Sequence, residues 1–376
     1  MTAFSDVIPV RYRQDLEHAA PDEPETIAEM VETFVGMART VATKEGHAFR
    51  AVHAKGHGLL RGSLAVTADL PEQYAQGLFA YPASFEALVR FSSPPAEQLS
   101  DGVSTPRAIA LKVRGVSGDR MDAGLDDGSQ DFLMVNGPAF PRPHAAGFLK
   151  DSKLLAATTE KAPQAKAVLS AVLRGTEQVL EAVGLESATV KNLGGHPQVH
   201  PLGETYFTQV PFLYGPYIAK FSITPVSPSL AALQGQHLQE NGDDAQREAI
   251  AAFFRSTAEP AQWALRVQLC VDVERMPIED ASVPWPAEAS PWITVATLSL
   301  PMQQSWEGDA TQAEEDALAF SPWNGLAAHR PLGGLNRARK VVMAASREHR
   351  AAFNECPIRG NAGPSGEDGR RHESPV

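Results

Sequence analysis

The hydrophobic positions of this chain follow a helical period near both ends and form short runs between them. Apolar residues three or four positions apart predict helices over residues 25–44, 163–184, 243–257 and 311–320, and from about Leu335 to Phe353. The short runs, separated by Gly, Pro, Ser and Asp, predict strands over residues 47–56, 58–68, 87–93, 106–116, 131–136, 203–211, 217–226, 262–273 and 292–300. Many strands between terminal helices indicate an α+β chain built on a central antiparallel barrel or sheet.

Composition and charge narrow the classes of protein that fit. The 376 residues include 33 Lys and Arg against 45 Asp and Glu, a formal net charge of −12. Such acidity disfavours a nucleic-acid or anionic-membrane partner. No apolar stretch is long enough for a membrane span, and the first residues lack a basic region followed by an apolar run, so we expect no secretory signal. With only Cys270 and Cys356, no disulfide framework is expected, which favours a reducing, cytoplasmic location.

Five segments in order carry a resemblance to a known family. They are Arg50-Ala51-Val52-His53-Ala54-Lys55-Gly56, Val89-Arg90-Phe91-Ser92, Pro106-Arg107 through Ala110-Leu111-Lys112-Val113, Asp131-Phe132 through Asn136-Gly137-Pro138-Ala139-Phe140, and Phe320-Ser321-Pro322 followed by a Gly-rich turn and a helix with Arg339. In this order and spacing the chain resembles the haem-dependent catalase family, in particular the small catalase-related peroxidases. The resemblance implies the catalase fold, an antiparallel β-barrel with flanking helices. It implies one haem domain over residues 25–356. The polar, Pro-containing residues 1–24 are predicted to form an arm, and the composition of residues 357–376 predicts a disordered tail.

The resemblance also implies roles for single residues around haem b and its iron. His53 is the distal acid–base residue that moves a proton between the two peroxide oxygens, and Ser92 fixes its ring. Val52 narrows the approach to the iron, and Phe148 stacks on the haem. The other cofactor contacts implied are Phe140 and the arginines that pair with propionates, Arg50, Arg90 and Arg350. From the residues alone, a buried strand histidine and structural arginine ion pairs remain alternatives.

Two positions depart from the family pattern. Asn136 lies one residue after the position where the family has an asparagine that orients peroxide, and Val135 occupies that position. One residue of offset turns a strand side chain to the other face, so either a bulge restores Asn136 to the pocket or that donor is absent. On the final helix the family has a tyrosine ligand four residues after an arginine, on the same helical face. Here the residue four positions after Arg339 is Met343.

The methionine leaves three possibilities for the iron. Met343 ligates it through the thioether, which gives less electron push than a phenolate. Alternatively, water or hydroxide beside Arg339 fills that position, or haem binds weakly or not at all. A methionine that only fills space on the helix is a further interpretation. Because a buried cation without a partner is costly, we expect Arg339 to be solvated or paired with an anion.

The function that the resemblance implies is an oxidoreductase of oxidative stress, a haem peroxidase or weak catalase that takes hydrogen peroxide or small organic peroxides and self-associates as a homodimer. One alternative is a non-catalytic haem-binding, sensing or structural protein, favoured by Met343 and by the offset of Asn136. A second is a fatty-acid hydroperoxide-converting enzyme of the allene oxide synthase type, disfavoured by Val52. His196 and His200 are interpreted as loop residues rather than metal ligands, and Cys270 as core.

Overall fold

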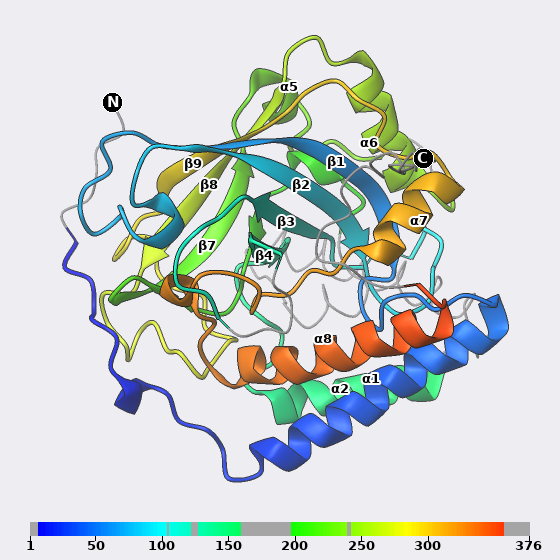
Figure 1. The fold of residues 1–376 in the computed structure, drawn as a ribbon, viewed down its shortest axis with the longest axis horizontal. Coiled ribbons are helices and arrows are strands. Elements are labelled where there is room, and N and C mark those ends of the chain that lie inside the picture. Colours follow the sequence, from blue (N-terminus) through cyan, green and yellow to red (C-terminus); the bar gives the residue numbers. More distant parts are fainter. Residues whose placement is uncertain (1–6, 104, 122–126, 159–196, 239–241, 357–376) are drawn as a thin grey trace, which may run out of the picture.

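The computed structural model describes residues 7–103, 105–121, 127–158, 197–238 and 242–356 (Figure 1). The helix predicted over 163–184, His196 and the predicted tail over 357–376 lie outside these ranges. The remaining predicted helices are confirmed, with bounds that differ by a few residues. They are α1 (Glu23–Glu45), α6 (Ala245–Ser256), α7 (Asp309–Ala317) and α8 (Gly334–Phe353), to which the structure adds α2 (Ala145–Thr158) and the short α5 (Pro228–Ala231).

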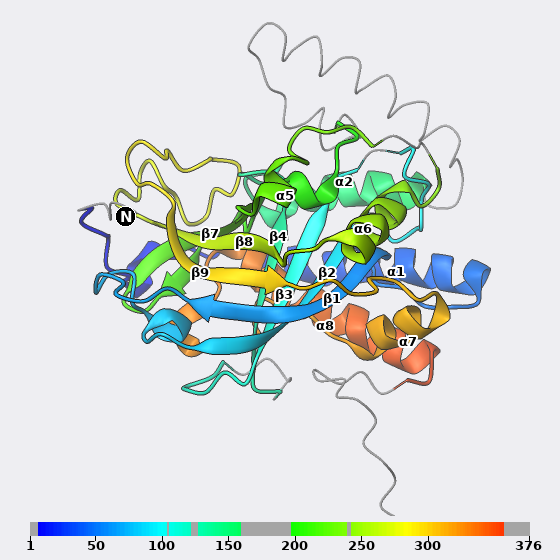
Figure 2. The same ribbon diagram turned by 90° about the horizontal axis from the view of Figure 1, so that it is seen from above.

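A closed antiparallel barrel forms the centre of the molecule (Figures 1 and 2). In the described ranges, nine strands make one sheet in the order β5-β4-β3-β2-β1-β9-β8-β7-β6. β5 pairs with both β4 and β7, which closes the sheet on itself. The strands are β1 (Lys55–Val66), β2 (Ser84–Ser93), β3 (Ala108–Arg114), β4 (Ser129–Val135), β5 (Tyr206–Phe207), β6 (Phe212–Tyr214), β7 (Tyr217–Pro225), β8 (Ala261–Leu269) and β9 (Ile293–Leu300).

Two predicted strands are shorter in the structure, each because a residue adopts a left-handed backbone. The prediction over 47–56 is wrong for most of its length, because β1 begins only at Lys55 and His53 has φ +54°. The prediction over 203–211 shrinks to Tyr206–Phe207, and Gln209 beyond it has φ +64°. A positive φ is incompatible with an extended strand, and a non-glycine residue adopts it at a cost. Side-chain periodicity does not show such a residue.

Three helices form a layer along one side of the barrel. In Figure 1, α1, α2 and α8 lie beside one another below the strands, and their apolar faces share one buried cluster. Local sequence signals set the ends of α1, which has Pro24 in its first turn and Gly46 in a left-handed conformation (φ +69°) at its end. α8 also contacts the segment that leads into β1, because the backbone N–H of Ala51 donates to Ser346 Oγ at 3.1 Å.

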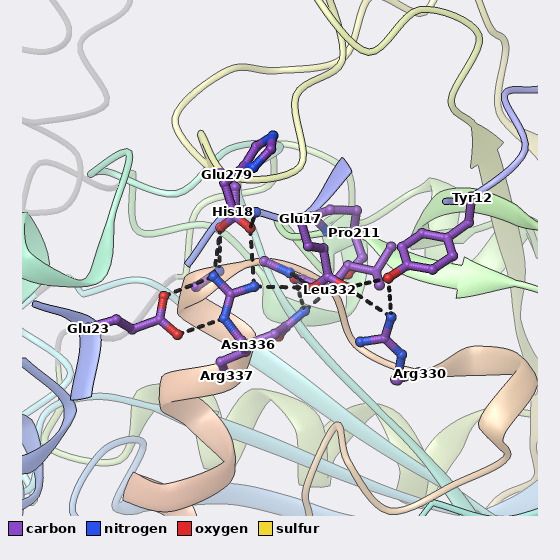
Figure 3. Close-up of polar contacts among 12 residues, drawn as sticks. Tyr12, Glu17, His18, Glu23, Pro211, Glu279, Arg330, Leu332, Asn336 and Arg337 are labelled. Carbon is purple, nitrogen blue, oxygen red and sulfur yellow. Dashed lines mark hydrogen bonds and ion pairs between the residues drawn. The ribbon is translucent and has the colours of Figure 1, made fainter. Parts of the chain in front are cut away.

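The arm before α1 is anchored to the start of α8 by a network of charges (Figure 3). Arg337 forms ion pairs with Glu23 (2.6 Å), Glu17 (3.2 Å) and Glu279 (3.1 Å). Hydrogen bonds and ion pairing with these carboxylates raise the pKa of Arg337. Glu17 also accepts a hydrogen bond from the backbone N–H of Gly333, just before the helix. The described part of the arm is therefore a fixed support for α8.

The aromatic interior of the barrel encloses a histidine whose protonation state links folding to pH. His329 is fully buried among Phe79, Tyr214 and Phe221, and its Nε2 accepts a hydrogen bond from Leu78 N–H at 3.0 Å. Burial lowers its pKa from 6.5 to about 4. Between about pH 6.5 and pH 4 this histidine is protonated in the unfolded chain but not in the folded chain. The free energy of unfolding therefore falls as the pH drops through this range.

We expect His329→Gln, which keeps an acceptor for Leu78 but removes the titration, to flatten this dependence. Urea unfolding of both proteins at pH 7 and pH 5 would measure it. The parent should lose about 2 kcal/mol more than the variant on that change of pH. Equal losses in the two proteins would contradict the assignment.

Candidate functional site

His53 lies immediately before β1, at the barrel edge that faces the helical layer. Its left-handed backbone stores strain, a feature that clusters at functional sites. Arg90 of β2 holds this conformation, because its guanidinium donates to the carbonyl oxygens of His53 (3.0 Å) and Ala54 (3.3 Å). The Nδ1 atom of His53 is buried and has no hydrogen-bond partner in the described residues. The strained backbone sets His53 apart from the buried His57 and His329, whose Nδ1 atoms also have no hydrogen-bond partner in the described residues.

The environment keeps the His53 ring neutral. Burial is the largest cause that lowers its pKa, to about 3, and the positive charges of Arg90 and Arg339 act in the same direction. A hydrogen bond with the backbone of Ser92 opposes the shift. The role predicted for the Ser92 side chain, fixing the ring of His53, stays a prediction. Arg339 belongs to α8, so both sides of the predicted site act on one imidazole.

A β-bulge follows His53 directly. The register of β1 against β2 shifts between Gly56 and Gly58, which leaves His57 as the extra residue. His57 is buried and its Nε2 lies 2.8 Å from the hydroxyl of Ser93. This contact makes His57 a structural anchor of the bulge. Just before the bulge, Lys55 pairs with Asp101 at 3.0 Å and ties the start of β1 to the loop beside α6.

The three arginines that the resemblance assigns to propionates converge at the end of α7. Arg90 Nε lies 2.9 Å from Glu315 Oε1, and Arg50 Nη1 lies 3.7 Å from Glu315 Oε2. Arg50 and Arg350 both donate to the carbonyl oxygen of Leu318, at 3.1 and 3.2 Å. The sequence analysis assigned these three arginines to one set of contacts, and in the structure they lie together. It did not identify Glu315. Its only signal was the acidic helix predicted over 311–320, where Glu315 is one of several carboxylates.

These arginines carry more charge than the protein around them neutralises. Burial is the main cause that lowers the pKa of Arg350 to about 10 and that of Arg50 well below its ordinary value. For Arg50, the charges of Arg90 and Arg350 add to the shift, and Glu315 and Asp316 oppose it. Arg350 is 3% exposed, and its Nε has no hydrogen-bond partner in the described residues. The cluster is suited to an additional anion.

Asn136 is held by a separate network. Its Oδ1 accepts a hydrogen bond from the backbone N–H of Arg107 at 2.8 Å, and its Nδ2 donates to Glu204 Oε1 at 2.9 Å. Arg107 and Glu204 are themselves an ion pair. Val135, the last residue of β4, pairs with Ala108 and Phe207. The amide oxygen and one of the two amide N–H groups of Asn136 thus have protein partners.

The helix opposite His53 carries the two residues assigned to the proximal side. Arg339 and Met343 lie one turn apart on α8, and both are half-buried. Burial lowers the pKa of Arg339 to about 10. In the described ranges Arg339 forms no ion pair, and its one hydrogen bond, 3.4 Å long, goes to the neutral Oδ1 of Asn336. The anion that we expected beside Arg339 is not supplied by the described part of the chain.

The aromatic residues assigned to the cofactor pocket pack between α2 and α1. Phe148 of α2 stacks on Phe34 of α1, with ring centroids 5.8 Å apart, and meets Phe140 edge-on at 4.9 Å. Val52 and Phe140 are partly buried against the same cluster. These three assigned residues are therefore neighbours of one apolar wall, which continues the helical layer towards His53.

One buried polar network joins three of the segments that carry the resemblance. Lys112 of β3 is fully buried and pairs with Asp131 of β4 (2.8 Å) and with Asp127 (3.0 Å). Asp131 also accepts a hydrogen bond from the backbone N–H of Ser321 at 2.9 Å. Asp127 and Ser129 also take part in the network, so the segment just before β4 is tied to it. The network fixes the loop that leads to α8.

Other candidate sites are not supported by the described residues. His200 accepts a hydrogen bond from Leu202 N–H at 3.2 Å and caps a short turn, which is a structural role. No three His, Cys, Asp or Glu side chains of these ranges gather as a metal site would require. Cys270 is buried, as predicted. None of the helices in the described ranges combines the length and apolar character of a membrane span.

Comparison with known proteins gives a result at the level of structure only. No protein-family model matches the chain, and no curated protein is significantly similar to it. Among solved structures, it resembles a fungal catalase (16% identity, TM-score 0.56, 84% of this chain and 62% of that one) and catalase A from Saccharomyces cerevisiae (16%, 0.58, 84% and 64%). A bacterial catalase is similar over 99% of this chain and 70% of its own, with 17% identity and a TM-score of 0.56.

The chain spans less than two thirds of the length of the first two of these catalases. Identities of 16 and 17% are too low to transfer an activity, but the likeness covers the barrel and the helices packed on it. The fold class predicted from the sequence is confirmed. This chain has the catalase fold.

Proposed function

We propose that the chain binds haem between the barrel edge at His53 and helix α8, and that it reduces or dismutates hydrogen peroxide or small organic peroxides there. The observation that carries the proposal is His53 itself. Its backbone is strained, its ring is neutral, and its buried Nδ1 has no hydrogen-bond partner in the described residues. The positive charge of Arg339, on the opposite helix, also lowers the pKa of the ring. Strained backbone conformations and strongly shifted pKa values cluster at functional sites.

A second observation supports a ligand space at this place. His53 and Arg339 both keep part of their surface accessible, yet desolvation is the main cause that lowers both pKa values. Surface open to bulk water would not be desolvated. We therefore attribute the accessible surface of both side chains to an interior space between the barrel and α8.

The residues around this space fit haem on three sides. Arg50 and Arg350 would hold a propionate, since their cluster has excess positive charge and a partnerless donor at Arg350 Nε. Val52, Phe140 and Phe148 would supply apolar contact. On α8, Met343 would face the iron with a neutral thioether, and a hydroxide beside Arg339 is the alternative fifth ligand.

His53 would provide the acid–base chemistry. When bound, haem would supply the iron at which a peroxide O–O bond is broken. The neutral imidazole would take a proton from one peroxide oxygen at a ring nitrogen and return it to the oxygen that leaves. Arg90 holds the backbone of His53 and adds a positive charge nearby, so it is a positioning residue. The low pKa keeps the ring in its unprotonated form at neutral pH, which is the form that a proton acceptor requires.

A non-catalytic haem-binding protein is the second candidate, and the placement of Asn136 favours it. The oxygen and one N–H of that amide are bonded to Arg107 and Glu204, which leaves only the second N–H for any contact with a peroxide. The phenolate implied by the resemblance is also replaced by Met343. Under this second proposal haem would bind, but peroxide turnover would be negligible.

Met343→Tyr separates the two candidates. The protein would be expressed with haem supply, and the spectra of parent and variant would be recorded in the ferric and reduced states. The new phenolate would lie one turn from Arg339 and would supply the anion that this guanidinium lacks in the described residues. An anionic ligand also gives more electron push than a thioether. We expect a high-spin phenolate spectrum and peroxide consumption raised at least about tenfold, which is about 1.4 kcal/mol in the barrier.

Met343→Leu is the matched control, because it keeps the apolar volume and removes the sulfur. Loss of a low-spin reduced spectrum in this variant would support ligation by the thioether. Haem binding without turnover in both the parent and Met343→Tyr would favour the non-catalytic candidate. Absence of a Soret band in the parent, even after titration with haem, would overturn both proposals.

A further inference from the structure

We propose that Glu315 stands in for one of the two propionates, so that the cluster of Arg50, Arg90 and Arg350 accepts a ligand through a single carboxylate. This inference rests on the proposed haem binding and adds to it the number of acidic groups that the site recognises. The arginines assigned to propionates by the sequence already share an internal carboxylate in the folded chain.

The position of Glu315 is a built feature of the fold. Its side chain has no exposed surface, and it lies 2.9 Å from Arg90. Gly56 of β1 makes room for it, since any Cβ added at Gly56 would collide with the carboxylate. Arg50 donates at 2.8 Å to the carbonyl oxygen of the same residue, so the backbone of Glu315 is fixed as well. A buried carboxylate held from three directions is not a surface group that swings away without cost.

The charges of the cluster leave room for one further anion. Three guanidinium groups face the carboxylates of Glu315 and Asp316, and Asp316 is shared with His47 at 2.9 Å. Counting these five groups gives a net charge of +1. In the described residues the Nε of Arg350, a residue 3% exposed, has neither a hydrogen bond nor an ion pair, whereas the Nε of Arg90 is paired with Glu315. One carboxylate would neutralise the cluster and satisfy this donor.

A second carboxylate would have the opposite effect. It would bring the cluster to a net charge of −1 and face Glu315 as a like charge in a place shielded from water, where such repulsion is strong. A diacid such as haem would therefore keep one propionate outside the cluster. The affinity of the parent protein should depend on the first acidic group and hardly on the second.

Porphyrin esters test this number directly. The parent protein, prepared without haem, would be titrated with ferric haem, its monomethyl esters and its dimethyl ester, and the Soret change would give each Kd. We expect haem and the monoesters to bind within about threefold of each other, and the diester at least about tenfold more weakly, about 1.4 kcal/mol. Because this measurement uses the parent protein, it does not depend on the folding of any variant.

The variant Glu315→Gln provides a second test of the same inference. Without this carboxylate the cluster carries +2, so the variant should bind haem at least about tenfold more tightly than the monoesters. Glu314→Gln is the matched control, since Glu314 is the preceding residue of α7 and pairs with Arg61 away from the cluster. The control should keep the pattern of the parent protein.

The outcomes separate the inference from the function on which it rests. A parent protein that binds haem at least tenfold more tightly than the monoesters would overturn the single-carboxylate site and leave haem binding intact. Equal affinity for haem, the monoesters and the diester would overturn it too, because the cluster would then not distinguish a carboxylate from an ester. No Soret change with any of them would overturn haem binding, and this inference with it.

Discussion

Haem-loaded His53→Gln is expected to consume peroxide about 10²- to 10⁴-fold more slowly than the parent protein. Glutamine keeps a polar side chain of similar reach but cannot take up and return a proton. The neutral ring and free Nδ1 of His53 are the features that this substitution removes. Steady-state kcat/KM for hydrogen peroxide, normalised to the haem content read from the Soret band, would measure the loss.

His200→Gln is the control for this experiment. His200 is also a largely buried histidine, and burial lowers its pKa to about 4, but its ring caps a short turn outside the site. Its replacement should change kcat/KM by less than about threefold once haem content is equal. If His53→Gln retained activity within the same limit, the proton transfer assigned to His53 would be wrong.

Lys112→Met is expected to lower the free energy of unfolding by about 3–5 kcal/mol. Lys112 and Asp131 have no exposed surface, so the substitution leaves the carboxylates of Asp131 and Asp127 without their cation. Urea unfolding followed by circular dichroism would give the change. Because Asp131 also binds the backbone of Ser321, the loop before α8 should become more susceptible to proteolysis.

Lys153→Met is the matched substitution at the surface. Lys153 pairs with Glu29, and both side chains are 54% exposed, so its loss should cost no more than about 1 kcal/mol. A cost for Lys112→Met as small as that of Lys153→Met would show that the buried network contributes little to the free energy of unfolding.

The elements of this fold and the types of residue at its site could be predicted from the sequence. Apolar periodicity is a local property, so it located α1, α6, α7 and α8 and most strands of the barrel. The order of the five segments was enough to predict the catalase fold. It also selected His53, Arg90 and Arg339, and in the structure the charges of both arginines lower the pKa of His53.

The pairing of charges was decided by the tertiary structure. Arg50 and Glu315 are 265 residues apart in the chain, and no local pattern links them. The same holds for Asn136 and Glu204, which are 68 residues apart and whose hydrogen bond occupies an amide donor that the sequence left undecided. The left-handed backbone of His53 also escaped prediction, because alternation of side chains describes faces and not dihedral angles.

The sequence by itself thus determined the catalase fold and the set of candidate site residues, since both depend on residue type and spacing. Only the tertiary structure decided which carboxylate meets which arginine and which ring nitrogen stays free. The physical reason is that buried charges and donors are satisfied by whichever partner the fold brings within a few ångströms, and that partner lies far away in the chain.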